Sequence, residues 1–136
     1  MSTCWGVLLT TKAALPLFPE SGGSVVNVSS IVSTLAPAYG SIYSGSKAAV
    51  DTITKSLAKE LAPRKIRVNA INPGYVVTEG TVKFAGSDFE KQAIATNPFG
   101  RAGTTADITP PVVFLASDDA AWITGETLYV SGGAGI

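Results

Sequence analysis

Apolar residues recur at helical spacing in two long stretches, and this periodicity predicts two helices. The first covers residues 1–18, where Pro16 weakens the last turn. The second covers residues 41–61 and is stopped by Pro63. Its apolar residues lie on one face of the helix, and its charged residues lie outside that face. This apolar stripe consists of Ala49, Ile53, Leu57 and Leu61.

A third helix is predicted near the C-terminus. Thr104 followed by Asp107 is an acidic relative of the capping box, which marks a helix start. The apolar run of residues 112–115 lies in this helix. Residues 110–111 are both proline, and a proline inside a helix costs ~3 kcal/mol. Either the helix begins later than Thr104 indicates, or the chain is under weaker selective constraint.

Short continuous apolar runs predict three buried strands, over residues 24–28, 66–71 and 126–130. Strands that alternate with helices, and that are apolar throughout, are typical of a parallel sheet covered on both faces. We therefore expect an α/β fold with right-handed crossovers. Three strands make a thin sheet, since about 4–6 is usual, so the chain has the architecture of a piece of a larger fold.

One long connection, residues 76–99, has only some helical pattern. Connections of this length are often functional lids. The remainder of the chain has no repeats, low-complexity tracts or linkers, and its 136 residues suit a single domain, residues 1–136.

Composition narrows the possible functions. The chain is 46% hydrophobic and 15% charged, which is typical of a globular protein. Ten basic residues balance ten acidic ones, so no strong field favours nucleic acid or a membrane surface. There is no histidine, which excludes Ser-His and Cys-His nucleophiles and histidine-ligated metals. We expect no metal site, and the single cysteine, Cys4, favours a reducing, cytoplasmic location.

The apolar N-terminal segment has two interpretations. It is apolar enough to suggest a signal peptide, but no basic residue precedes the apolar stretch and Lys12 interrupts it. An ordinary buried helix is the preferred interpretation. No run approaches the ~18 apolar residues of a transmembrane helix.

The sharpest candidate for chemistry is the pair Tyr43 and Lys47. They are four residues apart on the predicted helix and therefore share one face. An ammonium group beside a tyrosine hydroxyl favours the phenolate, as a general acid/base for an alcohol or carbonyl requires. Taken alone, the pair also fits a surface tyrosine and a solvated lysine. Ser30 follows the first strand, at the sheet edge where open α/β folds bind ligands, although a serine there is by default a turn residue.

These residues stand in a pattern that resembles the short-chain dehydrogenase/reductase family, in particular its glucose 1-dehydrogenase-like and 3-oxoacyl-acyl-carrier-protein reductase-like bacterial members. Tyr43 follows Ser30 by 13 residues, the family's common spacing. The resemblance covers essentially the whole chain. Its segments are 22–30 (GGSVVNVSS), 43–50 (YSGSKAAV), 67–74 (RVNAINPG) with Thr78, 114–118 (FLASD) and 123–128 (ITGETL).

The resemblance implies the C-terminal half of a Rossmann-type doubly wound parallel sheet, with the N-terminal half missing. It implies an NAD(P)-dependent oxidoreductase that transfers hydride between nicotinamide and a small alcohol or ketone. Tyr43 would be the general acid/base, Lys47 would assist it and bind the nicotinamide ribose, and Ser30 would hydrogen-bond the substrate oxygen. The loop holding the nicotinamide would consist of Pro73, Gly74, Val76 and Thr78. Family members also pair through the helices before and after Ser30, which implies a homo-oligomer, a dimer or tetramer.

Besides the proline pair at residues 110–111, the chain departs from the family pattern in two respects. No glycine-rich phosphate loop lies between a strand and a helix, and the nearest glycine cluster, residues 132–135, lies at the C-terminus. The acidic or basic residue that reads the ribose in the family is absent as well, so the resemblance does not distinguish NAD from NADP. The family's usual asparagine, 27 residues before Ser30, is replaced by Thr3.

Two other functions remain open. A truncated, non-catalytic fragment that keeps only the oligomerisation and active-site scaffold would account for the absent half. A serine acyl-transferase would use the S-x-x-K pattern of Ser44 and Lys47. Ser56 and Lys59 fit that pattern equally well, and neither K-T-G nor S-D-N is present, so this interpretation is disfavoured.

Overall fold

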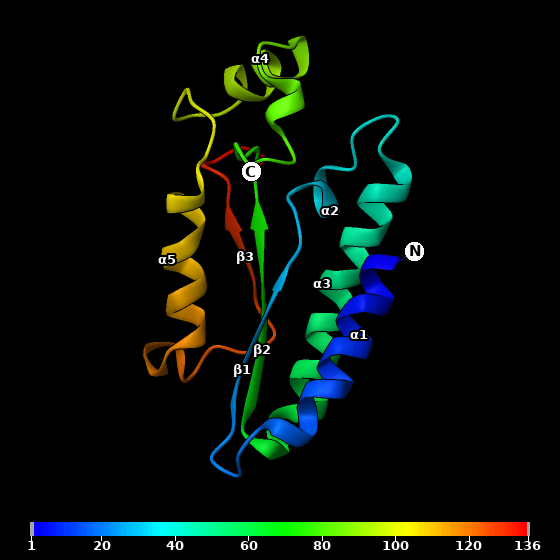
Figure 1. Ribbon diagram of the computed structural model, residues 1–136, viewed down its shortest axis with the longest axis vertical. Coiled ribbons are helices and arrows are strands. Elements are labelled where there is room, and N and C mark those ends of the chain that lie inside the picture. Colours follow the sequence, from blue (N-terminus) through cyan, green and yellow to red (C-terminus); the bar gives the residue numbers. More distant parts are fainter. Residues whose placement is uncertain (1, 136) are drawn as a thin grey trace.

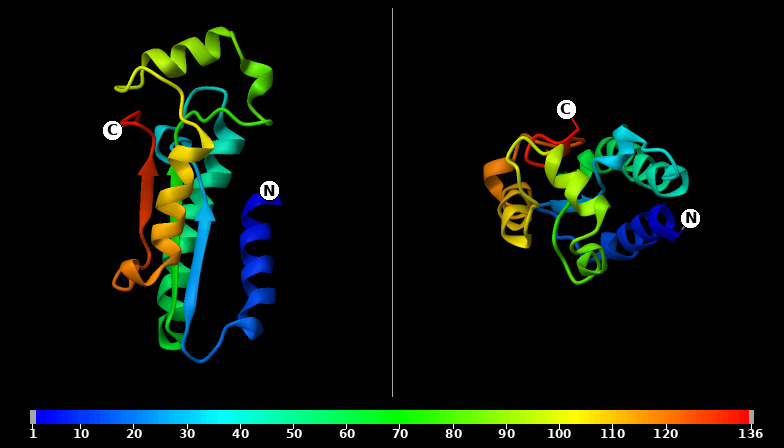
Figure 2. Two further views of the ribbon diagram at one scale, coloured as in Figure 1. Left: turned by 60° about the vertical axis from the view of Figure 1, so that its left-hand side comes forward. Right: turned by 90° about the horizontal axis from the view of Figure 1, so that it is seen from above.

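A parallel sheet lies between two helical layers in the computed structural model, which describes residues 2–135 and side chains from Cys4 to Gly135. Helices α1 (Ser2–Ala14) and α3 (Ser41–Leu61) lie on one side of the sheet. Helix α5 (Thr105–Ala116) lies on the other side, as the view from above in Figure 2 shows. The predicted α/β architecture with helices on both faces is confirmed (Figure 1).

The sheet in residues 2–135 has three parallel strands in the order β1-β2-β3. They are β1 (Gly23–Val28), β2 (Ile66–Pro73) and β3 (Thr127–Val130). Strand β2 is central and almost entirely buried, although it carries Asn69 and Asn72 among its apolar residues. It extends to Pro73, two residues beyond the predicted end, because Pro73 still pairs with Val130 of β3.

The hydrophobic core has two parts, one on each face of the sheet. On the α3 face, Ala58 and Leu61 pack with Ile66 and Val68 of β2. On the α5 face, Ile71, Leu115 and Ala120 form the buried cluster. Since side chains of a strand alternate between faces, Ile66 and Val68 lie on one side of β2 and Ile71 on the other.

Helix α3 has the predicted bounds, but its most buried face differs from the predicted one. The fully buried positions include Val50, Thr54 and Ala58, whereas Ala49, Ile53 and Leu57 are only half-buried. Leu61, the last residue of the predicted stripe, is buried in the core with Ile66 and Val68, whereas the other three lie beside the most buried positions of the helix. Apolar periodicity alone cannot find this face, because a buried threonine counts as polar.

Helix α5 begins where the Thr104–Asp107 pattern predicted, and both prolines lie inside it. The alternative of a later start is therefore wrong. The Thr104 N–H and hydroxyl both donate to Asp107 Oδ2, at 2.8 and 2.9 Å. These contacts fix the first turn despite Pro110 and Pro111.

Two short helices were not delimited by the sequence pattern. Helix α2 (Val32–Leu35) follows directly after the Ser30 segment. Helix α4 (Asp88–Ala95) lies within the long connection, where only some helical character was expected, and is capped by Ser87. Single 3-10 turns cover Leu15–Leu17, Ala62–Arg64, Val82–Phe84 and Asp118–Ala120.

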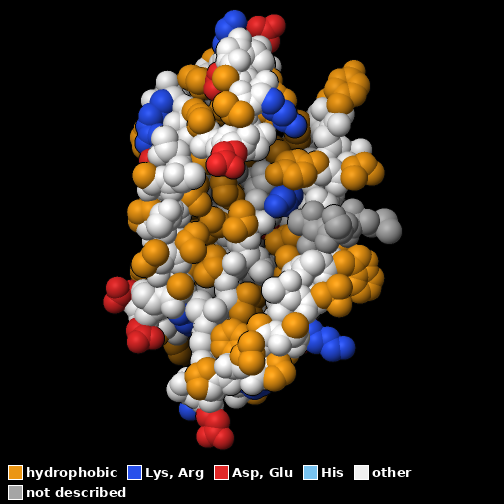
Figure 3. All heavy atoms as spheres, in the orientation of Figure 1, with side chains coloured by type: hydrophobic (Ala, Val, Ile, Leu, Met, Phe, Trp, Pro, Cys, Tyr) orange, Lys and Arg blue, Asp and Glu red, His pale blue; other side chains and the backbone are white. Residues whose placement is uncertain are grey.

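Strand β1 forms one edge of the sheet. In Figure 3, hydrophobic side chains gather along the middle of the visible face, where β1 lies between α5 and α1. Val28 at the end of this strand is 56% exposed. None of the helices in residues 2–135 is long and apolar enough to cross a membrane.

Candidate functional site

The carboxyl ends of all three strands lie at the upper edge of the sheet in Figure 1. The loop after β1, helix α2 and the first turns of α3 gather at this edge. Helix α4 lies above it. This is the edge at which open α/β sheets bind ligands, and it is where the sequence placed Ser30.

The Ser30 segment is held in line with β2 beyond the end of β1. The N–H of Ser29 donates to the carbonyl of Ile71 at 2.8 Å, and the N–H of Ile31 donates to that of Pro73 at 3.1 Å. Ser30 between them is 9% exposed, and its Oγ accepts the Val32 N–H at 3.3 Å. Since a hydroxyl both donates and accepts, the Ser30 proton remains available for another acceptor.

Tyr43 and Lys47 lie on one face of α3, as their spacing predicted. The Lys47 ammonium is 5.8 Å from the centroid of the Tyr43 ring, within the range of a cation–π contact. It donates a hydrogen bond of 2.9 Å to the carbonyl of Val28 at the end of β1. Tyr43 itself is 54% exposed, so its hydroxyl is accessible to a small molecule.

The surroundings of Lys47 affect its pKa in two opposite directions. Partial burial lowers the pKa of Lys47 from its ordinary value, because burial disfavours the charged ammonium. The carboxylate of Asp51, one turn further along α3, acts in the opposite direction and raises that pKa. Lys47 is thus a partly desolvated cation beside the Tyr43 ring.

Of the four residues expected to hold a nicotinamide, Pro73 ends β2, and Gly74, Val76 and Thr78 lie on the loop that follows it. Gly74 donates its N–H to the Val130 carbonyl at 3.2 Å, and a Cβ at Gly74 would come within 3.0 Å of the Ser131 backbone. Close packing against Ser131 therefore explains this glycine within the chain itself. Val76 forms an isolated bridge with Gly103 that uses the Tyr75 carbonyl and the Val77 N–H and leaves the Val76 N–H outside.

Thr78 is tied down within this same loop. Its N–H donates to Thr81 Oγ1 at 2.8 Å, and the two hydroxyl oxygens are 3.2 Å apart. Thr81 also donates to the carbonyl of Val76 at 2.8 Å. The sequence did not single out Thr81, although its spacing of three from Thr78 is a signal for a local side-chain turn.

The long connection, residues 76–99, is anchored at its start by aromatic and polar contacts. Tyr75 donates to Glu90 Oε1 at 3.1 Å and meets the Phe89 ring edge-on, with centroids 5.7 Å apart. Phe84 packs against Phe89 at 5.2 Å. Burial, followed by the Glu90 carboxylate, raises the pKa of Tyr75. The connection is therefore a structured cover attached to the β2 loop.

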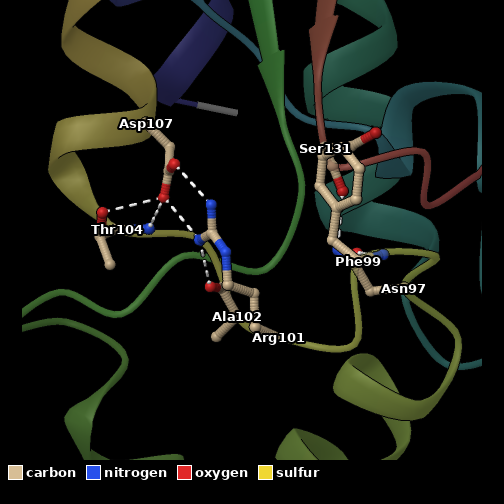
Figure 4. Close-up of polar contacts among 7 residues, drawn as sticks. All are labelled: Asn97, Phe99, Arg101, Ala102, Thr104, Asp107 and Ser131. Atoms are coloured by element: carbon tan, nitrogen blue, oxygen red, sulfur yellow. Dashed lines mark hydrogen bonds and ion pairs between the residues drawn. The ribbon is translucent and has the colours of Figure 1, made fainter.

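A cavity of about 620 Å³ opens beside this loop, lined mainly by residues 74–76, 97–99 and 129–133. Its wall is braced by two sets of contacts, shown in Figure 4. Asn97 donates to the Ser131 carbonyl at 2.9 Å, and Arg101 forms a bidentate pair with Asp107, both contacts at 2.8 Å. The size of the cavity suits a small molecule.

Sequence reasoning missed two polar residues at this edge, the buried Asn72 and the half-buried Asp51. Asn72 Nδ2 lies 3.0 Å from Asp51 Oδ2 and 3.2 Å from the carbonyl oxygen of Ser30. A signal for Asp51 was its spacing of four from Lys47. The position at which the family usually has asparagine is occupied by Thr3, whose side chain is not among those that the structure describes.

The chain is similar in sequence to known proteins. A family model described as enoyl-(acyl carrier protein) reductase matches residues 2–135. An uncharacterized oxidoreductase of Methylorubrum extorquens is 52% identical over 130 residues, which cover 94% of this chain and 52% of that protein. The 3-oxoacyl-acyl-carrier-protein reductase FabG of Vibrio harveyi is 41% identical over 124 residues, covering 90% of this chain and 50% of that protein.

Solved structures agree in fold. The angucycline C-6 ketoreductase LanV, crystallised with bound NADP, matches with a TM-score of 0.87 and 33% identity, over 94% of this chain and 49% of that one. The chain thus spans about half the length of the relatives it matches. A family model that matches nearly every residue, and a Rossmann-type parallel sheet with Tyr43 and Lys47 at its carboxyl edge, lead to one conclusion: the chain belongs to the short-chain dehydrogenase/reductase family.

Proposed function

We propose that this chain supplies the catalytic residues of an NAD(P)-dependent oxidoreductase that interconverts a small alcohol and its ketone. The observation that supports this most directly is the Lys47 ammonium, 5.8 Å from the Tyr43 ring at the carboxyl edge of the sheet. The names of two relatives, a 3-oxoacyl reductase and a ketoreductase, point to the same carbonyl chemistry.

Tyr43 acts as the general acid/base in this proposal. Its hydroxyl gives a proton to the carbonyl oxygen during reduction and takes it back during alcohol oxidation. The neighbouring Lys47 ammonium stabilises the phenolate that remains after proton donation, since opposite charges attract more strongly in a partly desolvated site. Lys47 is held in place for this role by its hydrogen bond to Val28.

Ser30 orients the substrate in this proposal. Its Oγ already accepts the Val32 N–H, so its own proton is free to point to the substrate oxygen. A donor fixed by backbone pairing to β2 needs little rearrangement when charge develops on that oxygen.

The chain's residues fit the nicotinamide end of a cofactor. The Val76 N–H lies outside the bridge to Gly103, and a carboxamide oxygen is a suitable acceptor for it. Thr78 would bind the same carboxamide through its hydroxyl, Lys47 would bind the ribose, and Pro73 and Gly74 would set the path of the loop. In this chemistry the nicotinamide supplies or accepts the hydride. The choice between NAD and NADP is left open.

We also propose a homo-oligomer, a dimer or tetramer, formed through α1 and α3. Exposed apolar side chains on these helices support it: Trp5 is 58%, Leu9 61% and Ile42 81% exposed. Side chains of this kind are enriched at interfaces between subunits.

The test is a Tyr43→Phe substitution, with Tyr39→Phe as the matched control. Tyr39 is fully exposed and lies one turn before Tyr43 in sequence, at the end of the loop that leads into α3. Both variants are assayed for ketone reduction with NADH and NADPH, alone and joined to the N-terminal half of the Methylorubrum extorquens relative. We expect Tyr43→Phe to reduce kcat by about 10²-fold or more without loss of fold, and Tyr39→Phe to have no effect. Near-normal turnover in Tyr43→Phe would overturn the assignment and favour a non-catalytic scaffold.

A further inference from the structure

Polar side chains join the sheet to α3 at three levels, in addition to the Lys47 hydrogen bond to Val28. Asn27 Nδ2 donates to Thr54 Oγ1 at 2.9 Å, Ser29 Oγ donates to the Lys47 carbonyl at 3.1 Å, and Asn72 Nδ2 lies 3.0 Å from Asp51 Oδ2. We call these three contacts the polar seam. Positions 47, 51 and 54 are one helical turn apart, so all three face the sheet. A buried polar contact fixes one relative position of the two elements, because any shift leaves its groups unpaired.

Asn72 makes the most contacts in the seam. It is fully buried, and its Nδ2 lies within 3.2 Å of three oxygens: the Ser30 carbonyl, Ser33 Oγ and Asp51 Oδ2. The orientation of the amide follows from this set. A flipped amide would place its oxygen against a carbonyl and a carboxylate, neither of which can donate.

The same amide group therefore holds both parts of the candidate site. On one side it fixes the carbonyl of Ser30, whose neighbours are already paired to β2. On the other side it fixes Asp51, one turn from Lys47. We propose that Asn72 is a positioning residue that locks the Ser30 segment to the turns of α3 carrying Tyr43 and Lys47. This inference rests on the proposed function, because it assigns Asn72 a purpose in that reaction.

The energetics favour positioning over simple stabilisation. Among the described side chains, Asp51 Oδ1 and Asn72 Oδ1 are buried without a hydrogen-bond partner. A buried acceptor without a partner lowers the free energy of unfolding, so an apolar pair at these positions would stabilise the packing of β2 on α3 at least as well. Costs of this kind are kept where a fixed geometry is needed, and sites for chemistry are such places.

Asn69 provides a matched control. It is an equally buried asparagine on the same strand, but it serves the β3 side: its Nδ2 donates to the Ile123 carbonyl at 2.9 Å and its Oδ1 accepts the Glu126 N–H at 3.0 Å. Asn72→Ala and Asn69→Ala therefore remove the same chemical group from the same strand. Only the first variant releases Ser30.

The first test is amide hydrogen exchange on the 136-residue chain, which needs no turnover. We expect Asn72→Ala to speed exchange of the Ile31 amide by about tenfold or more, with little change at Glu126. Asn69→Ala should do the reverse. Equal acceleration at both amides in both variants, or none at Ile31 in Asn72→Ala, would overturn the proposal. If Asn72→Ala does not fold, Asp51→Ala replaces it, and Asp51→Asn, which keeps the acceptor oxygen, should restore protection of Ile31.

The second test measures turnover in the form used for Tyr43→Phe. Asn72→Ala should lower kcat about tenfold or more and leave the KM for the nicotinamide cofactor within about twofold, since positioning affects the reaction more than binding. Asn69→Ala should keep its kcat per folded molecule. Loss of activity in Tyr43→Phe with unchanged kcat in Asn72→Ala would refute the positioning role and leave the function intact. If Tyr43→Phe stays active, the function fails, and the exchange experiment alone decides whether Asn72 holds Ser30.

Discussion

The pKa of Lys47 is set by two opposing electrostatic effects. Burial lowers its pKa, whereas the Asp51 carboxylate raises it, and burial is the larger effect. The Asp51 carboxylate and the hydrogen bond to the Val28 carbonyl both favour the charged form of Lys47. Asp51 thus has two roles, as an acceptor for Asn72 and as a counter-charge for Lys47.

Removal of this counter-charge should lower the pKa of Lys47 further. Asp51→Asn keeps the size of the side chain and deletes its charge, so only the effect of burial remains. A titration of the Lys47 Cε signal by NMR measures the change. Glu60→Gln, near the far end of the same helix and bonded to Ser56, is the control and should leave the Lys47 titration unchanged. A rise in the pKa in Asp51→Asn would contradict this account.

Asp107 should make the folding stability depend on acid. Its carboxylate accepts hydrogen bonds from Arg101 and from the Thr104 N–H and hydroxyl, and these hold its pKa well below the ordinary value. A carboxyl with a lowered folded-state pKa contributes stability above its unfolded pKa, near 3.9, and loses that contribution as the pH falls below it. Asp107→Asn should therefore unfold at a lower temperature than the parent at pH 7.

The difference in unfolding temperature between the parent and Asp107→Asn should become smaller as the pH is lowered from 5 toward 2. Thermal unfolding followed by circular dichroism measures it. The control is Asp88→Asn, since Asp88 is fully exposed and 3.7 Å from an exposed Lys91. An exposed ion pair of this kind contributes little, so its melting should match the parent at every pH. A gap that stays constant with pH would contradict the role of Asp107.

The sequence revealed part of the candidate site and concealed the rest for a physical reason. Tyr43 and Lys47 share a face because helical geometry fixes the relation of positions four apart. Asn72 and Asp51 are 21 residues apart and meet only once β2 and α3 are packed. Such a contact depends on the register between elements, and local periodicity carries no information about it.

At the scale of elements, the chain tolerates two prolines inside α5. A proline removes a backbone donor, and its ring clashes with the carbonyl four residues earlier. The Thr104–Asp107 contacts and burial of Leu115 hold the helix in spite of this. The sequence pattern predicted the helix start correctly because capping is a local interaction, whereas apolar periodicity misplaced the buried face of α3 because tertiary packing decides it.

Pro110→Ala should stabilise the protein. Pro110 is exposed, so alanine loses no packing there, and it restores a helical N–H. We expect the free energy of unfolding to rise by about 1–3 kcal/mol. Chemical denaturation measures the change, and Pro63→Ala is the control, because Pro63 is exposed in the first turn of a 3-10 helix where its missing N–H costs nothing. Equal stabilisation by both substitutions would show that α5 is not under strain.

At the scale of the whole molecule, the three strands form a sheet in which β1 is an edge. The pyrophosphate of a dinucleotide usually sits on a glycine-rich turn between a strand and a helix. No such turn occurs in the 136 residues. In the proposed function, the contacts left to a cofactor would be those of Lys47 and the segment from Pro73 to Thr78.

We therefore expect the 136-residue chain by itself to bind NADH and NADPH weakly or not at all. Titration calorimetry of the purified chain measures this. The same titration on the chain joined to the N-terminal half of the Methylorubrum extorquens relative is the positive control. A Kd in the low micromolar range for the chain alone would reveal a phosphate site that neither the sequence nor the fold indicates.

The central position of β2 also governs how the chain can fold. Its partners are far away along the sequence: Gly23 pairs with Ile66, and Ala70 pairs with Thr127. No two strands can form a hairpin, so every sheet hydrogen bond must await the closure of a loop of tens of residues. Chains dominated by such distant contacts cross a large entropic barrier and fold slowly. The β1–α3–β2 unit closes the shorter of the two loops, so we expect it to form first and β3 to dock onto a strand that has already been placed.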